Sequence, residues 1–168
     1  MMEILSAGVL VLSDKGARGQ RKDESGLFLR DALQKAGFKV VAYHILPDEY
    51  EDILVTLIDW VDRKGLDLIL TTGGTGLSPR DVTPEATKAA LDKEIPGIAE
   101  AIRIKGLEHT PRAMLSRGVA GIRKQTLIIN LPGSLKAVQE SWAIVVPVLS
   151  HALEKIKGAV SDCALRRE

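Results

Sequence analysis

The sequence contains very little cysteine and very few aromatic residues. Cys163 is the only cysteine among 168 residues, so an intramolecular disulfide and a thiolate metal cluster are both excluded, as is typical of the reducing cytoplasm. Aromatic residues make up 4% of the chain, too few for a surface on which nucleic-acid bases stack. The core must therefore be built from aliphatic side chains.

An excess of one charge and a long apolar run are also missing. A net charge of +1 argues against a nucleic-acid-binding protein, and a hydrophobic content of 45% argues against a disordered chain. The longest stretch without a charged residue, Ser141–Leu153, includes a proline and is too short to span a bilayer. Met1-Met2-Glu3-Ile4 does not resemble the start of a signal peptide. We expect a cytoplasmic protein that binds neither nucleic acid nor membrane.

A strand followed by a helix recurs in the first half of the chain. Ser25 is the predicted cap of the first helix, and Gly37 and Gly65 end the first and second helices. Strands that are apolar throughout and alternate with amphipathic helices indicate a parallel sheet covered on both faces. The predicted strands are 4–12, 38–46 and 66–70, and the predicted helices are 25–36 and 49–64.

The second half has a different pattern. Two helices are predicted, at Pro84–Leu91 (capped by Thr83) and at Pro96–Leu107. Val119–Ile122 and Thr126–Leu131 are close enough in sequence to form a hairpin. Ser134 should cap a last apolar helix, and Pro147 should break or restart it. The whole chain, 1–168, is thus predicted to be one three-layer α/β/α domain with a mostly parallel sheet, one antiparallel hairpin and a frayed tail at 158–168.

Polar or glycine-rich residues follow four of the predicted strands. In an open parallel sheet, ligands bind outside the carboxyl ends of the strands. The coincidence of four such ends therefore predicts the active edge of the sheet. The four segments are Ser13-Asp14, Pro47-Asp48-Glu49, Thr71–Gly76 and Asn130–Ser134.

The run Thr71–Gly76 carries the sharpest signal. Glycines at a strand end let backbone N–H groups approach an anion closely, and threonine hydroxyls add donors. The spacing fits neither a P-loop nor GxGxxG. A tight turn would explain a lone glycine pair, but here the loop continues to Arg80-Asp81 before a helix begins. This extended loop favours a phosphate site.

Asp48 and Asp81 form a second candidate constellation. Paired carboxylates near phosphates commonly hold Mg²⁺, which prefers oxygen ligands. A structural explanation is equally compatible with the spacing: Asp48 could start a turn after Pro47, and Asp81 could cap a helix. The residues alone leave both interpretations open.

Other polar residues give weaker signals. His44, His109 and His151 lack metal-ligand spacing. Arg112, Arg117, Arg123 and Lys124 are close in sequence and are expected to form a solvated basic face, from which one or two side chains could reach an anionic substrate.

The glycine run and the segment that follows it resemble the signature of the MogA/MoaB family of molybdenum-cofactor biosynthesis, which also includes the G domain of gephyrin. The likeness extends to Ser13-Asp14, Pro47-Asp48-Glu49 and Met114–Arg117, and covers about residues 5–155. Gly121-Ile122-Arg123 and Asn130–Gly133 make the chain look more similar to MogA than to MoaB.

This resemblance implies an adenylyltransferase that moves AMP from Mg-ATP to the terminal phosphate of molybdopterin and releases pyrophosphate. Asp48 and Asp81 match the two catalytic aspartates of the family, which favours a functional role over a structural one, and they would also hold Mg²⁺. The residues expected to bind substrate or nucleotide are Ser13, Asp14, Thr72, Gly73, Gly74, Thr75, Gly76, Arg80, Ser116, Arg117, Leu131, Pro132, Gly133 and Ser134.

The resemblance also implies partners and alternatives. The family is usually homotrimeric, and the apolar stretch Ser141–Leu153 suggests subunits that dock through an apolar helix surface. A transient contact with the molybdate-inserting MoeA-like enzyme is a further expectation. The alternatives are a non-catalytic, MoaB-like molybdopterin-binding protein and an oligomeric scaffold.

Overall fold

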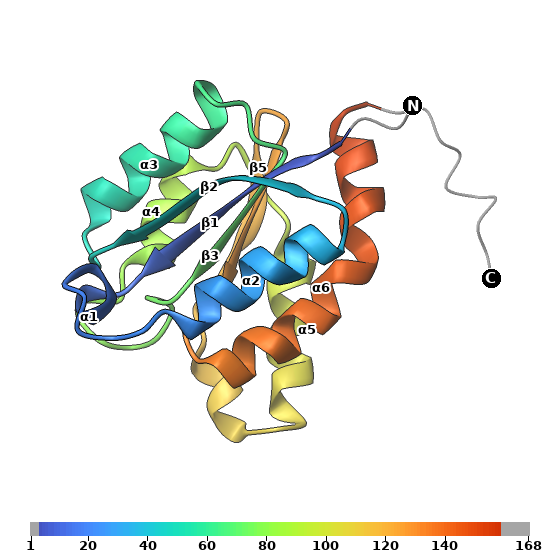
Figure 1. Ribbon diagram of the computed structural model, residues 1–168. Coiled ribbons are helices and arrows are strands. Elements are labelled where there is room, and N and C mark those ends of the chain that lie inside the picture. The colour runs from blue at the N-terminus through green and yellow to red at the C-terminus, as the bar shows by residue number, and fades with distance from the viewer. Residues whose placement is uncertain (1–3, 159–168) are drawn as a thin grey trace.

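Six strands form one sheet at the centre of the molecule. The computed structural model describes residues 4–158, and Figure 1 shows helices on both faces of the sheet. The strand order is β2-β1-β3-β6-β5-β4, with β2, β1, β3 and β6 parallel and the last two pairs antiparallel. The strands are β1 Ser6–Leu12, β2 Lys39–Leu46, β3 Leu68–Thr72, β4 Lys93–Glu94, β5 Ala120–Arg123 and β6 Thr126–Leu131. The predicted three-layer fold, mostly parallel with one antiparallel hairpin, is confirmed.

Alternate residues of each central strand enter two separate apolar cores. Leu68 and Leu70 of β3 lie in the core beneath α2 and α6, whereas Ile69 lies in the core beneath α3 and α4. This division follows from the two-residue period of a strand. Because both faces are covered, the central strands are apolar throughout. The helices are α1 Asp14–Ala17, α2 Glu24–Lys35, α3 Tyr50–Asp62, α4 Thr83–Ala90, α5 Pro96–Leu107 and α6 Leu135–Ile156, with a 3-10 turn, η1, at Pro111–Leu115.

Two predicted helix caps are wrong. Asp23, not Ser25, caps α2, because its carboxylate accepts the Gly26 N–H at 2.8 Å. Helix α4 begins at Thr83 rather than after it, and the Thr83 hydroxyl instead donates to the Gly73 carbonyl at 3.0 Å. Both predicted caps bond a distant carbonyl instead, since the Ser25 hydroxyl donates to Gly133 and the Thr83 hydroxyl to Gly73. Ser134 does cap α6 as predicted.

The predicted break at Pro147 is also wrong, because α6 continues through it. A proline inside a helix costs about 3 kcal/mol. The opposite face of α6 buries Val138, Val145, Leu149 and Leu153, and each such side chain contributes roughly 1.5–3 kcal/mol. Pro147 is exposed, so water can bond the carbonyl that loses its partner. Packing therefore outweighs the local penalty.

Three short elements were not anticipated from the sequence: α1, β4 and η1. β3 ends two residues later than predicted, at Thr72, so Thr71 and Thr72 belong to the sheet rather than to the loop. Cys163 and most of the predicted tail lie outside the described residues, and Gly158 follows α6 in a turn. Within residues 4–158, no helix is long and apolar enough to cross a membrane.

Candidate functional site

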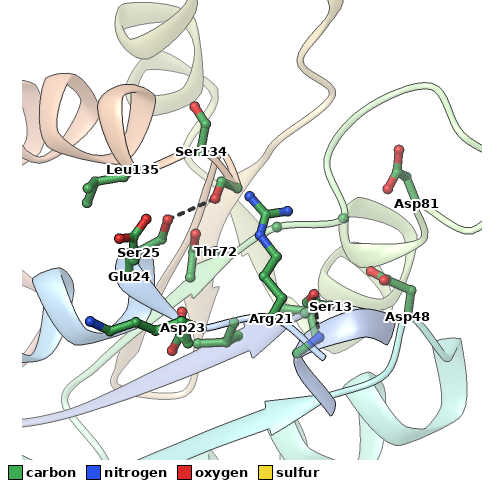
Figure 2. Close-up of a pocket in the computed structure, with 17 residues that line it drawn as sticks. Ser13, Arg21, Asp23, Glu24, Ser25, Asp48, Thr72, Asp81, Ser134 and Leu135 are labelled. Carbon is green, nitrogen blue, oxygen red and sulfur yellow. Dashed lines mark hydrogen bonds between the residues drawn. The ribbon is translucent and has the colours of Figure 1, made fainter. Parts of the chain in front are cut away.

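The carboxyl ends of the four parallel strands surround one polar cavity of about 340 Å³. Ser13 follows β1, Asp48 follows β2, Gly73 follows β3 and Gly133 follows β6. In Figure 2, Asp48 and Asp81 lie together on one side of this cavity, Asp23, Glu24 and Ser25 lie on the other, and the Arg21 side chain extends between them. Parallel pairing thus gathers segments that are distant in sequence, as predicted. The remaining lining residues are Val11, Leu12, Gly16, Lys22, Thr72, Gly74, Ser134 and Leu135.

Two predicted binding side chains, Thr72 and Ser13, together with Ser25, hold the backbone of this cavity in place. The Thr72 hydroxyl donates to the Pro132 carbonyl at 2.8 Å, and the Ser25 hydroxyl donates to the Gly133 carbonyl at 2.8 Å. The Ser13 hydroxyl accepts the Gly16 N–H and caps α1. These bonds tie the start of α2 and the end of β3 to the turn between β6 and α6, so hydrogen bonds within the protein hold the polar wall together.

The glycine pair is required by the protein's own packing. Gly73 has a φ of +98°, its N–H donates to the Leu131 carbonyl, and a Cβ there would lie 2.2 Å from the Leu12 carbonyl oxygen. Gly74 has a φ of +66°, and a Cβ there would lie 2.2 Å from Thr83 Oγ1. A larger residue would therefore strike the protein itself. Within residues 4–158, the N–H groups of Gly74 and Gly76 have no hydrogen-bond acceptor, which leaves them available to an anion.

Asp48 is held in an unusual electrostatic state. Its Oδ2 accepts the Asp14 N–H at 3.1 Å, while its Oδ1 is buried without a partner among the described residues. Burial raises the pKa of Asp48, and the negative charges of Asp14 and Asp81 raise it further, against the Asp14 N–H bond. The carboxylate is thus under-satisfied and available to a cation.

Asp14 and Arg80 form the support beneath Asp48. Asp14 accepts the Asp48 N–H at 3.0 Å and two bonds from the Arg80 guanidinium, at 2.9 and 3.1 Å. These bonds lower the pKa of Asp14 to about 2, with the Arg80 hydrogen bond as the main cause. Arg80 also pairs with Glu49 at 2.8 Å. Neither Asp14 nor Arg80 lines the polar cavity, although both were predicted to bind ligand.

Asp81 lines the polar cavity but does not cap a helix. Its Oδ2 accepts the Ser78 N–H at 2.9 Å, and the residue preceding α4 is Val82, which makes no side-chain cap. The helix-cap interpretation of Asp81 is therefore wrong. The Pro47 turn does form, since the Glu49 N–H donates to the Pro47 carbonyl, but the Asp48 side chain takes no part in that bond.

A second, larger cavity of about 600 Å³ lies beyond the glycine loop. Thr75 and Gly76 line it from the loop, Ser116 lines it from the end of η1, and Pro132 and Ser134 line it from the turn that also borders the polar cavity. Its remaining lining is mostly apolar, from α5, η1 and α6. These residues are Leu77, Ile102, Arg103, Gly106, Thr110, Arg112, Ala113, Leu115, Ala137, Glu140, Ser141 and Ile144.

The predicted site residues thus divide into three groups. The polar cavity receives Ser13, Thr72, Gly73, Gly74, Asp48, Asp81 and Gly133, the larger cavity receives Thr75, Gly76, Ser116 and Pro132, and Ser134 borders both. Asp14, Arg80, Arg117 and Leu131 line neither. Leu131 is buried in β6.

Sequence reasoning missed the acidic and basic residues that precede α2. Arg21, Lys22, Asp23 and Glu24 line the polar cavity, but their segment, between the predicted strand 4–12 and the predicted helix 25–36, was given no role in the site. The available signal was its position after β1, at the predicted active edge. Conversely, Arg123 and Lys124 are not a free basic face, because both pair with Asp62.

Asp48 and Asp81 are the candidate ligands for a metal ion in the polar cavity. Within residues 4–158, no group of three or more His, Cys, Asp or Glu side chains could hold one. Asp48 and Asp81 line the same cavity, and Asp48 presents a buried oxygen without a partner. Mg²⁺ is commonly bound by one or two carboxylates together with substrate phosphates. The pair therefore fits a cation that arrives with a polyphosphate, rather than a site made wholly of protein ligands.

Comparison with known proteins identifies the family. Residues 8–151 match the family model described as "Probable molybdopterin binding domain". The chain belongs to the molybdopterin-binding domain family. The molybdopterin adenylyltransferase of Helicobacter pylori J99 is 40% identical over 159 residues, which cover 94% of this chain and 90% of that protein.

Solved structures and longer relatives agree with this family. The crystal structure of the molybdopterin biosynthesis enzyme MoaB from Thermus thermophilus is 55% identical, with a TM-score of 0.87 over 92% of this chain and 98% of that one. The Drosophila melanogaster molybdenum cofactor synthesis protein cinnamon is 45% identical. The match spans 27% of cinnamon, and a similar match spans 22% of Dictyostelium discoideum gephyrin. One of these similar structures is thus named MoaB, and another is named MogA. The preference for MogA over MoaB therefore stays a prediction.

The first prediction concerns the stability cost of Asp48. A raised pKa means that the fold disfavours the ionised carboxylate, so ionisation of Asp48 lowers stability at pH 7. We expect Asp48→Asn to raise the melting temperature at pH 7 and the gain to shrink as the pH falls through the raised pKa towards 3.8. Thermal melts across this pH range measure both effects.

The control for this prediction is Asp14→Asn. The lowered pKa of Asp14 means that its contribution is complete above pH 3.8 and is lost as the pH falls towards 2. Asp14→Asn should therefore melt below the wild type at pH 7. An Asp48→Asn protein that is less stable than the wild type at pH 7 would contradict the electrostatic assignment.

Proposed function

We propose that this protein is a molybdopterin adenylyltransferase, which transfers AMP from ATP to the terminal phosphate of molybdopterin and releases pyrophosphate. The observation that carries the proposal is the pair Asp48 and Asp81 in one polar cavity, beside a glycine loop in which the Gly74 and Gly76 N–H groups have no acceptor within residues 4–158. Bacterial relatives that match over most of their length, from Helicobacter pylori and Haemophilus influenzae, are named molybdopterin adenylyltransferase, and this supports the proposal.

The proposed reaction is one displacement at phosphorus. A terminal phosphate oxygen of molybdopterin forms a bond to the α-phosphorus of ATP, and the bond from that phosphorus to the β-phosphate oxygen breaks. Such a transfer depends on positioning and on charge neutralisation rather than on a covalent protein nucleophile. The protein therefore has to hold two anionic substrates close together.

Asp48, Asp81 and the loop amides supply this arrangement in the proposed mechanism. Asp48 and Asp81 would hold Mg²⁺, which would supply neutralisation of the polyphosphate charge. The Gly74 N–H group, in the polar cavity, and the Gly76 N–H group, at the wall of the larger cavity, would donate to phosphate oxygens. Arg21 and Lys22 line the polar cavity as additional cations. The bonds that fix the cavity walls keep these groups in place before ATP binds.

We assign the two cavities to different substrates. The polar cavity, with its carboxylates and basic residues, suits the triphosphate of ATP. The larger cavity, mostly apolar with Arg103, Arg112 and Glu140 at its walls, suits a flat ring system with polar edges such as the pterin. Ser134 and the glycine loop border both cavities, so the reacting phosphates would meet there.

The second prediction tests the reaction itself. Purified protein incubated with molybdopterin and Mg-ATP should form adenylylated molybdopterin and pyrophosphate, detected by mass spectrometry. Asp81→Asn should lower kcat by about two orders of magnitude or more, because it removes one of the two carboxylates that would hold Mg²⁺ against the phosphates. Asp31→Asn, in the exposed face of α2, is the matched control and should keep wild-type turnover.

Two results would count against adenylyl transfer. Tight binding of molybdopterin without any product from the wild type would favour a non-catalytic binding protein. Near-normal turnover in Asp81→Asn would remove Asp81 from the mechanism.

The third prediction tests the division between the cavities. Ala137→Phe adds a ring to the larger cavity, so it should raise the KM for molybdopterin about tenfold while the KM for ATP changes little. Arg21→Ala should do the reverse. Ala143→Phe, on an exposed position of the same helix, controls for a general effect on α6. An equal rise of both KM values in Ala137→Phe would contradict the assignment.

The fourth prediction concerns the partners. We propose a homotrimer, and a transient contact with the molybdate-inserting MoeA-like enzyme that would consume the product. Val145, Leu149 and Leu153 of the apolar stretch 141–153 are buried within the subunit, but Val148 of α6 is 47% exposed. Light scattering at micromolar concentration should give three times the chain mass, and Val148→Asp should lower it, because docking would bury an unpaired charge. Lys136→Asp, exposed on the same helix, is the control.

A wild-type mass of one chain would refute association. A trimer that persists in Val148→Asp would support the oligomeric state and exclude this face of α6 from the subunit interface.

A further inference from the structure

The loop from Thr75 to Asp81 links the two cavities. Its first residues, Thr75 and Gly76, line the larger cavity, and its last residue, Asp81, lines the polar cavity. The part between, from Leu77 to Arg80, is exposed. Within the loop, the Ser78 N–H donates to the Asp81 carboxylate and the Asp81 N–H donates to the Ser78 carbonyl, both at 2.9 Å. These two bonds close the end of the loop but do not attach it to the rest of the protein.

Arg117 makes that attachment through both its backbone and its side chain. Its N–H donates to the Thr75 carbonyl at 2.9 Å. Its Nε donates to the Gly76 carbonyl at 2.7 Å, and its Nη2 donates to the Asp81 carbonyl at 2.7 Å. Its Nη1 pairs with Glu85 of α4. One residue therefore holds the beginning and the end of the loop at the same time.

These contacts distinguish Arg117 from a substrate-binding arginine. Its side chain is 35% exposed, and three of its nitrogen atoms are already bonded within the protein. It lines neither the polar cavity nor the larger cavity. A guanidinium that must bind phosphate would have to give up these bonds to the Gly76 and Asp81 carbonyls. The contacts favour a role inside the protein.

Arg80 supports the same loop from its other side. Its guanidinium bonds Asp14 and Glu49, beside the turn that carries Asp48. Arg117 and Arg80 thus hold the Asp81 end of the loop through different partners, one from the segment after η1 and the other from within the loop. Of the two, Arg117 is the one that also bonds residues lining the larger cavity.

We propose that Arg117 is a positioning residue, which fixes Asp81 in the polar cavity and couples it to the wall of the larger cavity. This inference rests on the proposed adenylyl transfer for its kinetic consequences, but not for its structural ones. The planar fork of arginine reaches the Gly76 and Asp81 carbonyls together, whereas a lysine ammonium is a single point charge. Arg117→Lys therefore keeps the charge and loses the geometry.

The matched control is Arg123→Lys. Arg123 also bonds a carboxylate, that of Asp62, and a backbone carbonyl, that of Ala90. It lies on β5 and lines neither cavity. Both variants lose comparable hydrogen bonds, so a fall in melting temperature is expected in each. Only Arg117→Lys should change the loop.

The first readout uses the ligand-free protein and needs no activity. Hydrogen–deuterium exchange of the hydrogen-bonded loop amides, those of Ser78 and Asp81, should become at least several-fold faster in Arg117→Lys, because the loop loses its attachment. The same amides should exchange at the wild-type rate in Arg123→Lys. Unchanged exchange in Arg117→Lys would overturn the inference whatever the enzyme does.

The second readout is kinetic. Misplacement of Asp81 should lower kcat by roughly ten- to a hundredfold with little change in either KM. When Arg117→Lys is added to Asp81→Asn, turnover should fall little further, because residues that act through one another are not additive. A rise in KM for either substrate, or independent losses that multiply in the double variant, would mean that Arg117 contacts substrate directly.

The two readouts separate this inference from the proposed function. If the wild type forms no adenylylated product and the exchange pattern is as expected, adenylyl transfer fails and the positioning of the loop by Arg117 stands. If the wild type is active and Arg117→Lys keeps wild-type kcat, the coupling of Arg117 to Asp81 fails and the function stands.

Discussion

Parallel pairing of β2, β1, β3 and β6 is the constraint on which the site depends. It brings the ends of four strands to one edge, so that Ser13, Asp48, Gly73 and Gly133 surround a single cavity. A parallel sheet must be covered on both faces, and the helices that cover this one bury two apolar cores. The resulting stability can support an edge that contains glycines at positive φ and a poorly satisfied carboxylate.

Charge at the edge is arranged in two levels. Asp14 is fully paired, through Arg80 and the Asp48 N–H, and its pKa is lowered to about 2. Asp48 above it has a raised pKa and one oxygen without a partner in the described chain. Asp14 therefore stabilises the fold through its bonds, while Asp48 keeps its capacity to bind a cation. Such a difference between neighbouring carboxylates is typical of sites where one group is structural and the other is functional.

The sequence predicted the elements other than α1, β4 and η1, their layers and the edge that carries the site. It was less successful where a tertiary contact overrides a local rule. Ser25 looked like a helix cap, but its hydroxyl reaches Gly133, which is 108 residues away. Pro147 looked like a helix break, but α6 continues past it because the packing of its buried face outweighs the penalty of the proline. Arg21 and Lys22 carried no motif, and only the path of their loop brings them to the polar cavity.

The sequence by itself determined the order of strands and helices and the residue types at each strand end, because apolar periodicity and turn chemistry are local properties. It also carried the family, through a long collinear set of motifs. Only the tertiary structure decided which polar groups are already bonded. Gly73 and Arg117 both belonged to the predicted binding set, yet the Gly73 N–H bonds Leu131 and the Arg117 guanidinium bonds Gly76 and Asp81. Hydrogen-bond satisfaction depends on distances between distant segments, and no spacing along the chain encodes those distances.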